Sequence, residues 1–95
     1  MDINYTRDAF DSLTALLLFI EKENIKGAGI RWLDKFESFL METLPLHEVI
    51  TYCNNKTFHQ LKLKCINYND WIIAFTINDT NITIEAILHK SRLKD

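Results

Sequence analysis

The sequence predicts a small α+β domain in which a helical hairpin packs on one face of a mostly antiparallel, four-stranded sheet. Three observations predict this fold class. Apolar residues recur at helical spacing in the first half of the chain, they alternate with polar residues in the second half, and only two glycines and one proline interrupt the pattern. The 95 residues are enough for one two-layer core but not for two, so residues 1–95 are expected to form a single domain.

The first element is a short strand, because residues 3–5 alternate between apolar and polar side chains. A helix follows. Thr6 or Asp8 can cap its start, and apolar residues then recur every three or four positions as far as Ile20. This broad apolar stripe is typical of a helix that is buried along one side.

The segment Gly27-Ala28-Gly29 ends the first helix, and a second helix is expected from Ile30 to Thr43. Leu44-Pro45 stops it, because the residue before a proline disfavours the helical conformation. The short connection between the two helices predicts an antiparallel hairpin and completes the order strand, helix, helix.

Three strands are expected in the second half of the chain, separated by turns at 67–70 and 78–81. Residues 58–65 alternate, with Lys62 and Lys64 on the side opposite Leu61 and Leu63. Residues 71–77 are almost wholly apolar, as in a central strand. In the last strand, one side is expected to carry Ile82, Ile84, Ala86 and Leu88, and the other Thr83, Glu85, Ile87 and His89.

Charge and composition favour a cytoplasmic protein. The net charge of −2 is unfavourable for nonspecific nucleic-acid binding, which needs a basic excess. No basic segment followed by an apolar run opens the chain, and the longest apolar run, residues 15–20, is far shorter than the roughly 20 residues that span a bilayer. We therefore expect Cys53 and Cys65 to be reduced thiols rather than a disulfide.

An aromatic-rich strand, an acidic turn, an isoleucine-alternating strand and a histidine with a basic residue nearby follow one another in residues 71–92. This arrangement resembles the RelE/ParE superfamily, also called plasmid stabilisation system proteins, and the resemblance covers nearly the whole chain. It implies the toxin of a bacterial type II toxin–antitoxin pair, neutralised by a cognate antitoxin. One branch of the superfamily inhibits DNA gyrase, and another cleaves messenger RNA on the ribosome.

Many members carry arginine where this chain has His59 and Ile72. Because both arginines are missing, we expect a ParE-like toxin that inhibits an essential target such as DNA gyrase. Two alternatives stay open: a RelE-like, ribosome-dependent endonuclease, and a degenerate toxin-like module that only binds a partner. Whether the protein is an enzyme and whether it forms a homodimer also stay open.

The endonuclease alternative makes His89, Glu85, Lys62 and Lys64 the candidate catalytic residues. If they share the open sheet face, Glu85 or His89 can act as base or acid while the two lysines hold the phosphate. A solvated sheet face that carries ordinary charge pairs is the commoner explanation, since alternating lysine and glutamate are frequent on exposed strands.

Contacts with a target or nucleic acid are assigned to Arg92, Lys64 and Lys90, although Arg92 and Lys94 can also simply solvate the end of the chain. The antitoxin is expected on the exposed sheet edge and on an open face that carries Ile72, Ile87 and Phe58. No metal site or cofactor is predicted, because the histidines and cysteines match no zinc spacing.

Overall fold

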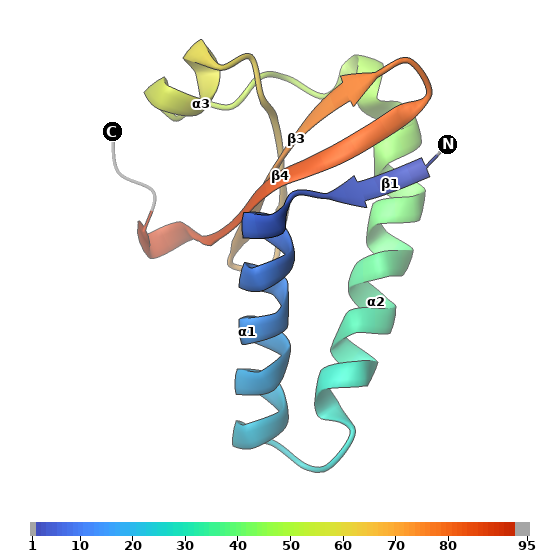
Figure 1. Ribbon diagram of the computed structural model, residues 1–95, viewed down its shortest axis with the longest axis vertical. Helices are drawn as coiled ribbons and strands as arrows, with labels where there is room; N and C mark the ends of the chain where they lie inside the picture. Colours follow the sequence, from blue (N-terminus) through green and yellow to red (C-terminus); the bar gives the residue numbers. More distant parts are fainter. Residues whose placement is uncertain (1, 93–95) are drawn as a thin grey trace.

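The computed structural model describes residues 2–92 and confirms the α+β class. A strand and a helical hairpin come first, and three strands follow (Figure 1). The elements are β1 (Asp2–Tyr5), α1 (Arg7–Glu23), α2 (Ala28–Thr43), the 3-10 helix η1 (Leu44–Val49), α3 (Lys56–Gln60), β2 (Lys64–Tyr68), β3 (Trp71–Asn78), β4 (Asn81–His89) and the 3-10 helix η2 (Lys90–Arg92). None of the helices in this range is long and apolar enough to cross a membrane.

The four strands form one mixed sheet in the order β1-β4-β3-β2. β1 runs parallel to β4, while β2–β3 and β3–β4 are antiparallel hairpins. The hairpins turn tightly at Asn69 and Asp79, which both adopt the left-handed conformation that asparagine and aspartate tolerate better than most residues. The first and last strands of the chain are therefore neighbours in the sheet.

Side-chain hydrogen bonds fix the start of each helix in the hairpin. The Thr6 hydroxyl oxygen caps α1 by accepting a hydrogen bond from the Ala9 amide at 3.1 Å. At α2, Gly27 has a φ of 86°, and the Glu21 carboxylate accepts hydrogen bonds from the amides of Gly27 and Gly29. These bonds let α2 begin at Ala28, two residues before the start expected from the sequence.

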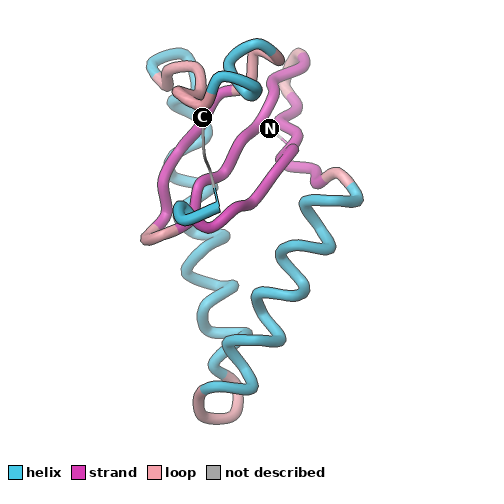
Figure 2. Tube along the Cα trace, turned by 90° about the vertical axis from the view of Figure 1, so that its left-hand side faces the viewer, coloured by secondary structure: helices cyan, strands magenta, loops and turns pink. Residues whose placement is uncertain are grey.

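Both long helices pack on one face of the sheet, which we call the helix face. Figure 2 shows that the far end of the hairpin extends beyond the sheet. The main core lies between these layers, and its buried residues are Ala9, Leu13, Phe36, Leu40, Leu44, Ile66, Ile73, Phe75, Ile82, Ile84 and Ile87.

The strand expected at residues 58–65 is present but starts six residues later, as β2 from Lys64 to Tyr68. Residues Lys56–Gln60 form α3, whose start is capped by the Asn55 side chain through a 3.0 Å hydrogen bond from the Phe58 amide. Lys62 then takes a left-handed conformation with a φ of 60°, which turns the chain before β2 begins at Lys64. The alternation of apolar and polar residues in this segment therefore reflects a capped helical turn and a short return.

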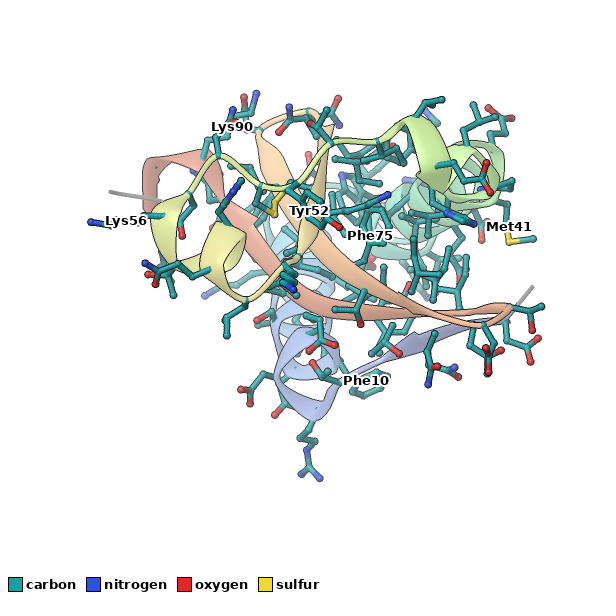
Figure 3. All side chains as sticks on the ribbon, turned by 90° about the horizontal axis from the view of Figure 1, so that it is seen from above. Phe10, Met41, Tyr52, Lys56, Phe75 and Lys90 are labelled. Carbon is teal, nitrogen blue, oxygen red and sulfur yellow. A yellow bond between two sulfur atoms is a disulfide. The ribbon has the colours of Figure 1, made fainter. Side chains whose placement is uncertain are left out.

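The second face of the sheet is partly covered by the segment that contains α3. Cys53, Leu63 and Ala74 form a small buried cluster there, and Phe58 packs against it. Cys53 and Cys65 form a disulfide, visible as the yellow bond beside Tyr52 in Figure 3, so the expectation of reduced thiols is wrong. The cysteines meet where the Cys53 amide donates to the Leu63 carbonyl, one residue before β2.

A β-bulge in β4 changes which residues face the helices. Ala74 pairs with Ala86 but Phe75 pairs with Ile84, so Glu85 is an extra residue without a partner directly across. Beyond the bulge the alternation reverses, which buries Ile87 in the main core. The expected placement of Ile87 on the open face is therefore wrong, and so is that of Ala86 and Leu88 on the helix face.

Candidate functional site

An open groove of about 490 Å³ lies between α1 and the end of β4, and we call it the α1–β4 groove. It is mainly apolar, and polar side chains gather where η2 follows β4. Its lining residues are Ser12, Ala15, Leu16, Phe19, Trp71, Ile87, Leu88, His89, Ser91 and Arg92.

His89 lies in this groove on the helix face, because it pairs across the sheet with Trp71. The two rings meet edge to face with centroids 5.2 Å apart. The Nδ1 atom of His89 accepts a hydrogen bond from the Ser91 amide at 3.2 Å and lies 2.9 Å from the Ser91 hydroxyl. Since an amide can only donate, the neutral ring carries its proton on Nε2.

Glu85 lies on the second face, at the bulge. Its carboxylate accepts a 2.9 Å hydrogen bond from the Thr76 hydroxyl, and Thr76 lies between two β3 residues that face the helices. The Thr6 hydroxyl donates to the Glu85 carbonyl at 3.3 Å, which ties the bulge to the start of α1. The carboxylate is therefore on the face of the sheet opposite to His89.

The two lysines come from the turn before β2 and from its first residue. Lys62 is exposed on the turn after α3. Lys64 opens the edge strand β2, and its ammonium donates a 2.7 Å hydrogen bond to the His47 carbonyl and lies over the Tyr52 ring. The structure does not gather the four candidate catalytic residues around one point.

The basic residues at the end of β4 lie closer to the groove. Lys90 and Arg92 are exposed on η2, and Arg92 lines the groove next to His89. The Lys90 amide is bonded to the Asp70 carbonyl at 2.9 Å, which fixes η2 against the β2–β3 turn. Lys94 lies outside the described residues.

The sequence analysis missed the α1 wall of the groove. Phe19 is 61% exposed although it belongs to an uninterrupted apolar run. A helix buries only one stripe of such a run, so the run itself signals that some of its apolar residues stay uncovered. Three residues were expected to contact the antitoxin on the open face. Of these, Ile87 is buried, and Phe58 and Ile72 are half-buried.

Among residues 2–92 no three histidine, cysteine or acidic side chains come together as metal ligands would. The fold and the groove define a small α+β domain with a helical hairpin on a mixed four-stranded sheet. The sequence matches no model of a known protein family, and no curated protein is significantly similar to it.

Proposed function

We propose that this protein is a ParE-like toxin of a bacterial type II toxin–antitoxin module, which inhibits an essential macromolecular target such as DNA gyrase by binding it. A cognate antitoxin neutralises it by laying an amphipathic segment in the α1–β4 groove. The observation that carries the proposal is this groove, in which Phe19, Leu16 and Trp71 offer an apolar floor. Arg92 adds positive charge at one end, which suits an acidic segment.

The order of elements and the helical layer on one face also support the proposal, because they are what the RelE/ParE resemblance implies. The separation of the candidate catalytic residues favours binding over RNA cleavage. Cleavage through a 2′-hydroxyl needs a base, an acid and positive charge around one phosphate. Here Glu85 and His89 lie on opposite faces, and the Lys64 ammonium is held by a backbone carbonyl.

Antitoxin binding is tested by co-expression with the product of the adjacent gene and measurement of the dissociation constant. Phe19→Asp places a charge in the groove, and we expect it to weaken binding at least about thirtyfold. Phe10→Asp is the matched control, because Phe10 lies on the same helix outside the groove lining and is 56% exposed. Equal effects of both substitutions, or no complex with the wild-type chain, would contradict the proposal.

The target is tested by expressing the chain without its antitoxin. We expect growth arrest with DNA breaks and induction of the DNA-damage response, and no ribosome-dependent cuts when transcripts are mapped by primer extension. Cuts that disappear in His89→Ala and Lys62→Ala would establish the endonuclease instead. Unimpaired growth would favour a toxin-like module that only binds a partner.

A target of this kind implies a cytoplasmic location, where cellular reductants keep most cysteine pairs reduced. The Cys53–Cys65 disulfide is an exception to this rule. Alkylation of intact cells before lysis measures whether the pair is oxidised where the protein acts, and fully reduced thiols there would show that the disulfide forms only after lysis.

A further inference from the structure

The two edges of the sheet differ. The outer edge of β2 is covered by the chain that precedes α3, through a bridge between Tyr52 and Lys64 and hydrogen bonds that flank it. The Cys53–Cys65 disulfide fastens this cover. β1 is the other edge, and within residues 2–92 no strand pairs with its outer side. In Figure 1 β1 is the outermost strand, crossing in front of α2.

The backbone of β1 is oriented for pairing on that outer side. The Thr6 amide donates to the Ile84 carbonyl at 3.0 Å, so it points toward β4. Amide and carbonyl groups alternate in direction along a strand, and Asn4 therefore also points toward β4. The amides and carbonyls of Ile3 and Tyr5 consequently point outward, at the spacing that an added strand requires. The strand contains no lysine, proline or bulge that would block such pairing.

Beside this edge lies a groove of about 380 Å³ between β1 and the second half of α2, which we call the β1–α2 groove. Leu40 and Met41 form its apolar side, and Met41 is exposed at the outer side of the molecule in Figure 3. Ile3 and Tyr5 are on the helix face. An added strand would therefore place every second side chain beside Met41 and Glu37.

The charges around the groove have one sign. Asp2 and Glu37 line it, and Asp34 and Glu42 line the adjoining hollow that shares Glu37 and Met41. Neither lining set contains a lysine, arginine or histidine. Burial and the nearby Glu37 carboxylate raise the pKa of the Tyr5 hydroxyl, which indicates that the negative field extends to β1.

We propose that β1 and the β1–α2 groove bind an extended, basic peptide segment of a partner protein as a fifth strand of the sheet. Its backbone pairs with Ile3 and Tyr5, and lysine or arginine side chains at alternate positions meet Glu37. Backbone pairing supplies affinity, and the acidic groove selects the partner. This surface is separate from the α1–β4 groove, and the proposal does not depend on the toxin assignment.

The probe is a short peptide with blocked ends that alternates lysine and valine, added to the full chain and followed by NMR. We expect the amides of Ile3 and Tyr5 to exchange more slowly with solvent, while the amide of Asn4, already directed at β4, changes little. A peptide with glutamate in place of every lysine is the matched probe, and we expect it not to bind.

Glu37→Lys reverses the central charge, and we expect it to weaken binding of the lysine peptide about tenfold. Glu23→Lys is the control, because it makes the same change in net charge at the far end of α1, away from the groove (Figure 1). Methylating the peptide nitrogens that face β1 should abolish binding to the wild-type chain.

Four results would overturn the proposal. The first is that the lysine peptide does not bind, and the second is that the glutamate peptide binds as tightly as the lysine peptide. The third is that the Glu37→Lys variant binds the lysine peptide as tightly as the wild-type chain. The fourth is that, without peptide, the Ile3 and Tyr5 amides become protected from exchange as the protein concentration rises. The last result would assign the edge to a second copy of the chain.

Discussion

The Glu21 carboxylate near the end of α1 accepts a 2.9 Å hydrogen bond from the Gly29 amide at the start of α2. Its second oxygen accepts a 2.8 Å bond from the Gly27 amide. One side chain of the first helix thus caps the second, and places a negative charge at the positive end of the helix dipole. The loop between the helices is therefore held by a specific interaction as well as by packing.

Replacing Glu21 with Gln should lower the melting temperature at neutral pH and flatten its pH dependence. The hydrogen bonds from Gly27 and Gly29, which favour the charged form, hold the pKa of Glu21 below its ordinary value of 4.5. Its contribution to stability is therefore complete above that value, and is lost as the pH falls through the lower folded pKa. Melting curves of wild type and Glu21→Gln between neutral and acidic pH should converge at the acidic end. For the control Glu23→Gln, the difference in melting temperature from wild type should be the same at neutral and at acidic pH.

Gly29→Ala should destabilise the contact between the two helices. A Cβ at this position would lie 2.9 Å from the Leu17 carbonyl oxygen and 3.3 Å from Glu21 Oε1. Overpacking of this kind outweighs the better helix propensity of alanine, and we expect a net loss of about 1–2 kcal/mol in the free energy of unfolding. Chemical denaturation measures it. Ser38→Ala, on the exposed side of α2, serves as the control, and an equal stability for both variants would contradict the close approach.

Thr6→Ala should cost about 1 kcal/mol of stability, because the hydroxyl caps α1. The same hydroxyl donates to the Glu85 carbonyl, so the substitution should also shift the NMR signals of the β4 bulge. Thr6→Ser keeps both hydrogen bonds and should restore both readouts. If Thr6→Ser is as unstable as Thr6→Ala, the hydroxyl is not the stabilising group.

Removing the disulfide with the double substitution Cys53→Ala/Cys65→Ala should lower the free energy of unfolding by about 2–4 kcal/mol. Hydrogen exchange should accelerate at the backbone amides of positions 53 and 65, which donate to the carbonyls of Leu63 and Thr51. The amides in α1 and α2 should keep their order of protection. Uniformly faster exchange throughout the chain would indicate that the disulfide supports the whole fold rather than the cover of β2.

Most of the fold could be predicted from the sequence, because the helices and the β3–β4 hairpin have long, regular apolar patterns. The segment that contains α3 could not. A five-residue helix is too short to show a helical period, and His59, Leu61, Leu63 and Cys65 alternate as a strand would. The disulfide was missed for a different reason, since the pairing depends on how this segment folds back against β2.

The candidate site was harder to predict than the fold, because one inserted residue decides it. The position of His89 at the end of the last strand was expected, and β4 does end there. The face of the sheet on which His89 lies was not expected, because the bulge at Glu85 reverses the alternation of every residue that follows. Nothing in the run from Ile82 to Leu88 distinguishes a regular strand from a bulged one.

The parallel pairing of β1 with β4 has a consequence for synthesis on the ribosome. Thr6 and Glu85 are joined across 79 positions of the chain, so the sheet cannot be completed until the chain has left the ribosome as far as β4. The helical hairpin, whose contacts are local, can form well before then. A nascent chain would carry this hairpin with its apolar stripe uncovered and depend on chaperones to prevent aggregation until the last strand arrives.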